Sequence, residues 1–384
     1  MNWICRAILV VALDLLLATA SCAQAASQGK LPRGRNAYDQ AFDLLQAGKP
    51  NEALAELDTA LSTEPDDPSL NNLRGLVAAQ LGHSAEAEAS FKKVIRLLPH
   101  AAMGYNNLAA LLWQEGLSAE AATNFRHAIK EEPKNFTALV GLGTILSETQ
   151  DYEGAVPYLQ RAWSSRPGDF QAGYELARSL SEIKRPSEAR SILPKLTVPQ
   201  DNATAAKFYI LSARVAEELG DNQSAAQNYH RAFELNPQSF EIYSALVRST
   251  LTKKDSSWGQ LPASPTGLSA AQHFALGLMF ASSSAYPMAV SHFERTLQLE
   301  PTSQSAIYNL ALAYKGAGNP QAAIDLLHQK VEAQPNAELC DLLASMEEEA
   351  GLYVQAVRHY QRAVSLDPTK EQYYFDLGAE YLLH

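Results

Sequence analysis

Cysteine is scarce in this chain of 384 residues, which contains only Cys5, Cys22 and Cys340. So few cysteines, two of them at the N-terminal end, cannot form the disulfide framework that stabilises many small secreted domains. Stability must therefore come from packing. Apolar residues make up 46% of the chain, which is enough for a continuous core.

Positive charge is also in short supply. The chain has 31 lysine and arginine residues against 42 aspartate and glutamate residues, a net charge of −11. Nucleic-acid binding depends on neutralising phosphates with basic side chains, and anionic lipids attract basic segments in the same way. The acidic balance therefore argues against nucleic acid as a partner and against docking of the folded part on anionic membranes.

Long apolar runs are absent except at the N-terminus. Residues 7–20 (AILVVALDLLLATA) are interrupted by Asp14 and are shorter than the roughly 20 residues of a membrane-spanning helix. Small residues follow, and Ala23-Gln24-Ala25 fits the cleavage rule of secretory signal peptides. We predict a signal peptide over residues 1–25, a linker over residues 26–33, and no membrane span after the signal is removed.

Cys22 offers a second interpretation of the same segment. It follows Thr19-Ala20-Ser21, which resembles the lipobox of bacterial lipoproteins, with Thr19 in place of the usual leucine. Lipidation would anchor the chain to the envelope, whereas simple cleavage would leave it periplasmic or secreted. A third interpretation is a buried N-terminal helix, which Asp14 favours but which the lack of amphipathic spacing disfavours.

Catalytic and metal-binding motifs are missing. None of the nine histidines forms H-x-x-x-H or H-E-x-x-H, and there is no P-loop, no G-x-S-x-G and no G-x-G-x-x-G. His230, His292 and His359 each stand beside a packing aromatic, so we expect them at the edges of helices. We expect no cofactor, no metal and no enzymatic activity.

The strongest positive signal is the spacing of prolines. Those at 65, 99, 133 and 167 are each 34 residues apart, those at 301 and 335 are again 34 apart, and Pro237 and Pro368 fall close to the same phase. Because proline lacks an N–H and clashes with the preceding turn, it ends a helix. A helix therefore ends once in every period of about 34 residues.

Other residues recur in phase with these prolines. Alanine lies twelve residues before each of them, at positions 53, 87, 121, 155, 225, 289, 323 and 356. A large apolar residue lies eight before, at Leu57, Phe91, Phe125, Leu159, Tyr229, Phe293, Leu327 and Tyr360. Glycine or alanine recurs twenty-four before, at Ala41, Gly75, Ala109, Gly143, Ala213, Gly277 and Ala311.

This pattern resembles the tetratricopeptide repeat (TPR), a pair of antiparallel helices per 34 residues. The resemblance covers the chain from about Gly34 onward and implies an all-α, superhelical solenoid of about nine to ten repeats. Small residues let helix backbones approach, and the large residue fills the space between them. One pair cannot bury both of its faces, so each repeat depends on its neighbours.

Departures from the period predict the domain organisation. Residues 34–251 form a front array that includes a degenerate repeat near 170–205. Residues 252–267 (TKKDSSWGQLPASPTG) are rich in proline, glycine and serine and predict a loop, acting as a connector, a hinge or a binding insertion. A rear array follows over residues 268–370, and residues 371–384 form a capping helix at the C-terminus.

The family resemblance implies that first helices line a concave groove, with the residue after the Gly/Ala position pointing inward. Three successive repeats carry arginine there, at Arg178, Arg214 and Arg248. Guanidinium groups in a groove suit an acidic segment or a C-terminal carboxylate. The alternative is that the arginines pair with nearby glutamates. The candidate glutamates are Glu175, Glu182, Glu217, Glu218 and Glu241.

A second candidate patch contains amides and one indole. Asn106 and Asn107 lie early in a first helix that ends with Trp113, and Asn309 occupies the position of Asn107 in a later repeat. In tetratricopeptide clamps an asparagine at that place binds the backbone of a peptide, but the accompanying lysines are missing here. Trp113 is either a peptide-stacking side chain or a filler between repeats.

These features predict a scaffold outside the cytoplasm that binds a protein or peptide in its groove. Two alternatives remain open. The chain could be a lipoprotein, anchored at Cys22, of outer-membrane, pilus or polysaccharide-export machinery, or it could be the non-catalytic partner of an enzyme on a separate chain.

Overall fold

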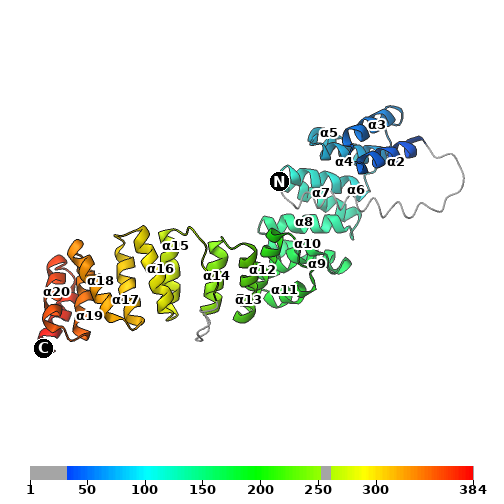
Figure 1. Cartoon of the computed structure of the whole chain (residues 1–384). Coiled ribbons are helices and arrows are strands. Elements are labelled where there is room, and N and C mark those ends of the chain that lie inside the picture. Colours follow the sequence, from blue (N-terminus) through cyan, green and yellow to red (C-terminus); the bar gives the residue numbers. More distant parts are fainter. Residues whose placement is uncertain (1–32, 252–260, 384) are drawn as a thin grey trace. The chain divides into compact units, whose positions relative to one another are not determined.

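The computed structural model describes residues 33–251 and 261–383, and these residues form twenty α-helices, one short 3₁₀ helix and no strand (Figure 1). The predicted signal peptide, the linker to residue 32, the lipidation candidate Cys22 and most of the predicted loop at 252–267 lie outside these ranges. None of the described helices is long and apolar enough to cross a membrane.

The helices form antiparallel pairs, each with a first and a second helix. In residues 33–198 the first helices are α2 (Arg33–Gln46), α4 (Pro68–Gln80), α6 (Ala102–Gln114), α8 (Phe136–Glu148) and α10 (Phe170–Glu182). Their partners are α3 (Pro50–Thr63), α5 (Ser84–Leu97), α7 (Ser118–Glu131), α9 (Tyr152–Ser165) and α11 (Pro186–Ile192), the last continued by η1 (Leu193–Lys195).

The same arrangement continues in residues 199–383. The first helices there are α12 (Asn202–Glu218), α14 (Phe240–Leu251), α15 (Ala270–Ser282), α17 (Gln304–Gly316), α19 (Ala337–Glu349) and α21 (Glu371–Leu383). The second helices are α13 (Asn222–Leu235), α16 (Tyr286–Leu299), α18 (Pro320–Ala333) and α20 (Tyr353–Leu366). The predicted all-α fold of repeated helix pairs is confirmed.

The periodic prolines mark where the second helices end. Every one of the eight periodic prolines lies two residues beyond the last residue of a second helix. The turn inside each pair has its own recurring feature, a residue with left-handed φ. It is glycine in most repeats, as at Gly116 (φ 82°), but glutamine at Gln150 (φ 65°). A left-handed turn therefore stands 17 residues before each proline.

Small and large residues meet inside the pairs as the sequence predicts. All eight periodic alanines are fully buried, and the eight large residues that follow them are at most 3% exposed. A Cβ atom added at Gly277 would lie 2.5 Å from Cε1 of Phe293. The glycine is thus needed for the close approach of α15 and α16.

First helices also contact one another from one repeat to the next. The contacting pairs are α2–α4, α4–α6, α6–α8 and α8–α10, and further along the chain α15–α17 and α17–α19. In these stretches the first helices therefore form a continuous layer, and side chains from consecutive repeats can act on the same partner.

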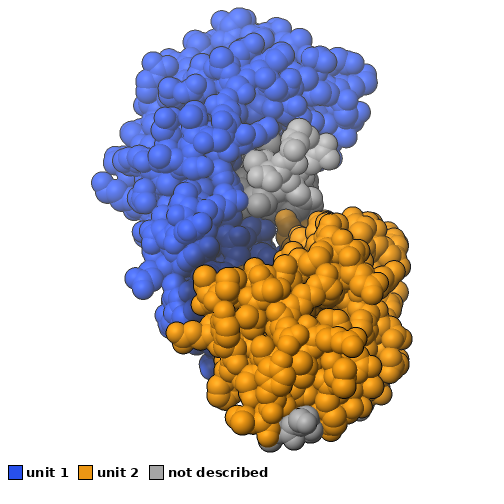
Figure 2. All heavy atoms as spheres, turned by 90° about the vertical axis from the view of Figure 1, so that its left-hand side faces the viewer, with its two compact units in different colours: residues 1–198 blue, residues 199–384 orange. Residues whose placement is uncertain are grey.

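The chain divides into two compact units, residues 1–198 and residues 199–384 (Figure 2). The first unit ends after Val198, inside the predicted degenerate repeat, whose second helix, α11, has only seven residues. Most of the predicted break between arrays at 252–267 lies outside the described residues. The segment after α14 packs on it: Leu268 is buried, and Tyr243 donates a hydrogen bond to the Pro262 carbonyl (3.3 Å).

The last helix, α21, packs on α20 in the position of a further first helix. A terminal cap normally presents a polar outer face. Here Phe375 is 71% exposed and Leu382 is 88% exposed. The helix predicted to cap the array is present, but its outer face is apolar.

Candidate functional site

Asparagines link consecutive first helices in the first unit. The Asn107 side chain on α6 donates a hydrogen bond to Oδ1 of Asn72 on α4 (2.6 Å). Asn106 is buried and donates to Oδ1 of Asn135 (2.9 Å), which in turn caps the start of α8. The Asn106 side chain is therefore committed to the joint between repeats, while the half-buried Asn107 lies at the surface of the layer.

Trp113 also joins two repeats. It is 8% exposed, and its Nε1 donates a hydrogen bond to Oε2 of Glu148 on α8 (3.2 Å). This contact matches the filler role that the sequence allows for Trp113. Asn309, in the second unit, is half-buried and donates to the carbonyl of Ser305 within its own helix (2.8 Å).

Arg178 holds a buried carboxylate. It forms a 2.8 Å ion pair with Glu175, whose side chain is 6% exposed, and its Nη2 donates to Oγ of Ser147 on α8 (2.7 Å). The ion pair expected as the alternative role of Arg178 is thus present. The side chain neutralises Glu175 and links α10 to α8.

Arg214 and Arg248 lie in the second unit, on the consecutive first helices α12 and α14, and both are exposed. The Arg248 side chain is 62% exposed, and its Nη2 lies 3.5 Å from Oε1 of Glu217. Glu217 also accepts a hydrogen bond from Tyr229 (2.8 Å). Burial and this bond raise the pKa of Tyr229, while the charges of Arg248 and Arg214 lower it. Both guanidinium groups therefore act on the same small region.

A hollow of about 590 Å³ lies beside α13 and α14 in the second unit. Its lining includes Ala226, His230 and Arg231 of α13, Leu246 and Thr250 of α14, and Leu261. Ala226 is half-buried, and described residues 261–269 contain no second helix for α14.

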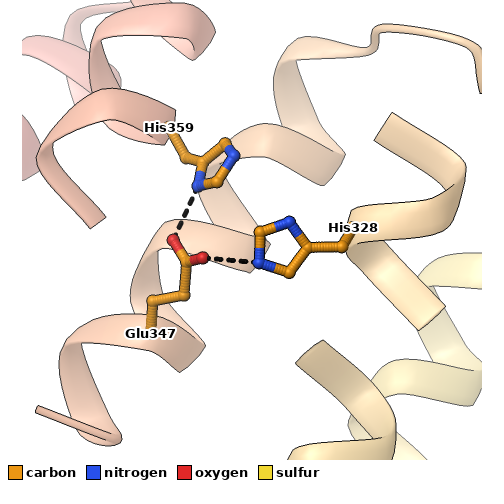
Figure 3. A group of neighbouring side chains, drawn as sticks. All are labelled: His328, Glu347 and His359. Atoms are coloured by element: carbon orange, nitrogen blue, oxygen red, sulfur yellow. Dashed lines mark hydrogen bonds and ion pairs between the residues drawn. The ribbon is translucent and has the colours of Figure 1, made fainter. Parts of the chain in front are cut away.

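Three side chains from three helices converge at the far end of the second unit (Figure 3). Nε2 of His328 on α18 lies 2.9 Å from Oε1 of Glu347 on α19, and Nδ1 of His359 on α20 lies 2.6 Å from Oε2. Glu347 is fully buried, the His359 side chain is 16% exposed and the His328 side chain is 40% exposed. The three ligand atoms lie within 4.8 Å of one another, close enough for one metal ion.

Sequence motifs do not reveal this cluster, because they describe ligands on one helix and these come from three. The expectation that His292 and His359 lie at helix edges is wrong: His292 is 6% exposed and His359 is largely buried. A usable signal is the place of Glu347 in the repeat. Other repeats carry a buried apolar residue there, at Ala78, Leu112, Leu146, Leu180, Ala216 and Phe280.

Comparison with known proteins is consistent with this architecture. A family model described as Tetratricopeptide repeat matches residues 38–102, 106–170 and 308–371, and two more with that description match 146–209 and 206–239. The chain is 22% identical over 332 residues to the human protein O-mannosyl-transferase TMTC3, covering 82% of this chain and 33% of that protein. It is 24% identical over 343 residues to DnaJ homolog subfamily C member 3 of Gallus gallus, covering 80% and 66%.

The chain thus spans a third of the length of the first of these relatives and 66% of the second. Among solved structures, PilF of Pseudomonas aeruginosa is similar, with 20% identity, a TM-score of 0.47, and coverage of 55% of this chain and 96% of that chain.

Proposed function

The chain belongs to the tetratricopeptide-repeat family, and on this premise we propose that it is a scaffold that binds an acidic segment of a partner protein. The observation that carries the proposal is the exposed arginine pair of the second unit. Arg214 and Arg248 stand one repeat apart on consecutive first helices, in a chain whose net charge is −11.

The ion pair of Arg248 favours exchange of partners. The contact between Arg248 and Glu217 is 3.5 Å long and the arginine is 62% exposed. Exposed ion pairs of this kind contribute at most about 1 kcal/mol, so a carboxylate of a bound segment replaces Glu217 at little cost. Arg178 is different, because releasing it would leave Glu175 buried without its counter-charge. We therefore assign the binding role to Arg214 and Arg248, and a mainly structural role to Arg178.

The first unit carries a separate candidate contact: Asn107 is half-buried on α6 and has an amide group of the kind that binds a peptide backbone, while its neighbour Asn72 is buried. In this proposal the chain acts without a chemical step, and any reaction belongs to a partner on another chain.

The proposed location is outside the cytoplasm. The support is the apolar segment at residues 7–20 with the Ala23-Gln24-Ala25 cleavage pattern. Lipidation of Cys22, with a role in assembly of the envelope, is the second candidate. Mass spectrometry of the mature N-terminus distinguishes the two, because a chain that begins at a diacylglyceryl Cys22 carries the lipid and residues 22–25, which a chain that begins near Ala26 lacks.

The binding proposal is tested by identifying a partner from the envelope fraction and then measuring its binding segment, as a synthetic peptide, by isothermal titration calorimetry. We expect the double variant Arg214→Glu, Arg248→Glu to weaken binding at least tenfold, with helicity unchanged. Arg295→Glu, which changes an exposed arginine on the second helix α16, is the matched control and should stay within twofold of wild type. Equal binding by all three proteins would remove the arginine pair from the site.

A further inference from the structure

We propose that His328, Glu347 and His359 form a binding site for a divalent transition-metal ion, Zn²⁺ above all, which joins α18 to the helix pair α19–α20. The Glu347 side chain is 0% exposed, at a position where six other repeats carry a buried apolar residue. A carboxylate in a core is costly unless a positive charge compensates it.

Hydrogen bonding leaves the Glu347 carboxylate incompletely satisfied. Oε2 is bonded to His359, but Oε1 has no hydrogen bond among the described residues. Nε2 of His328 is only 2.9 Å from Oε1, but this close contact is not a hydrogen bond. A buried carboxylate oxygen and a ring nitrogen therefore lie side by side without a hydrogen bond between them, as two ligands of one ion would.

The ligand atoms of the three side chains suit a zinc ion. Two imidazole nitrogens and one carboxylate oxygen are a ligand set that zinc accepts, with the fourth position left for water or another ligand. Bonds of roughly 2.0–2.2 Å place tetrahedral ligand atoms about 3.4 Å apart. Nε2 of His328 lies 2.9 Å from Oε1, Nδ1 of His359 lies 2.6 Å from Oε2, and the three candidate ligand atoms lie within 4.8 Å of one another, so the side chains need only small shifts to admit the ion.

Access and selectivity follow from the same geometry. The His328 side chain is 40% exposed, which opens the cluster to solvent on one side. Mg²⁺ and Ca²⁺ prefer oxygen ligands and find only one carboxylate here. Imidazole suits Zn²⁺, Ni²⁺ and Cu²⁺. The ion would bind α18 of one repeat to both helices of the next and so stiffen the joint between them.

The test uses the full chain, purified without a histidine tag and stripped of metal with a chelator. Titration calorimetry with Zn²⁺ should show one ion per chain and a rise in the thermal midpoint, and Co²⁺ should give the intense visible absorption of tetrahedral coordination. Mg²⁺ should produce neither effect. His328→Ala, His359→Ala and Glu347→Gln should each weaken Zn²⁺ binding by at least tenfold.

The matched control is His230→Ala. His230 occupies the position of His328 in an earlier repeat, and its side chain is 44% exposed. The His230→Ala variant should bind Zn²⁺ as wild type does. His328→Ala removes a partly exposed side chain, so far-UV circular dichroism should show an intact fold. The proposal is overturned if wild type binds no Zn²⁺, if the His328→Ala, His359→Ala double variant binds it equally, or if Mg²⁺ binds as well.

Discussion

A Cβ atom added to Gly143 on α8 would lie 2.5 Å from Cγ of Leu159 on α9, and Leu159 is fully buried. The two helices therefore approach at a distance that only glycine permits. Gly143→Ala should destabilise the first unit, because overpacking a core costs about 1–3 kcal/mol. Urea denaturation followed by helicity measures the change.

Gly378→Ala provides the control for this substitution. Gly378 also lies inside a helix, but no neighbouring atom lies within 4 Å of an added Cβ. Alanine there should be neutral or stabilising by up to about 1 kcal/mol, since it favours the helix. If the two variants unfold with the same change in free energy, the close approach at Gly143 is not limiting.

Gln150 holds the left-handed turn between α8 and α9, at φ 65°, in the position that glycine takes at Gly116. A non-glycine residue in this conformation costs about 1–2 kcal/mol. Glycine avoids this cost, but its greater freedom in the unfolded chain offsets part of the gain in stability. Gln150→Gly should therefore stabilise the fold by about 0.5–1 kcal/mol. The reverse change, Gly116→Ala, should destabilise it by a similar amount in the same denaturation experiment. The two substitutions should change the free energy of unfolding in opposite directions. A loss of stability in Gln150→Gly would contradict this expectation.

The periodic part of this fold can be predicted from the sequence because it depends on short-range spacing. Proline, the small residues and the large residue after them recur at fixed intervals. Gly143 and Leu159 occupy the small and the large position of one repeat, and they lie in close contact. The same periodicity explains why the helix ends near the prolines are predictable to within two residues.

Contacts between side chains that depart from the repeat pattern could not be predicted from the sequence. Arg178 is bound to Glu175 because that carboxylate is buried, which spacing alone leaves open. The cluster around Glu347 needs three helices to be placed. Each of these is a property of packed side chains and not of the repeat.

Arg178 and Arg248 should differ in their contribution to stability, although both occupy the same position of the repeat. Arg178→Ala leaves a buried carboxylate without its counter-charge and should cost about 1–3 kcal/mol. Arg248→Ala removes an exposed pair and should cost less than about 1 kcal/mol. Free energies of unfolding from urea titration, measured with and without Glu175→Gln, give the coupling. Similar small losses for both arginines would show that Glu175 does not depend on Arg178.

His292 should make the stability of the second unit depend on pH. Its Nδ1 lies 3.0 Å from Nδ1 of His273, and its ring stacks on Phe280. Burial, and next the charge of His273, lower the pKa of His292 to about 4. The unfolded chain, with a histidine pKa near 6.5, then binds a proton more readily than the folded chain.

It follows that the stabilising contribution is complete above about pH 6.5 and is lost as the pH falls toward 4. The free energy of unfolding should drop by about 2 kcal/mol between pH 7.5 and pH 5 through this residue alone. His292→Leu should remove that part of the slope, while His230→Ala, an exposed histidine, should keep it. Denaturation series at the two pH values give the difference directly, and parallel pH profiles for wild type and His292→Leu would show that folding does not lower the pKa of His292.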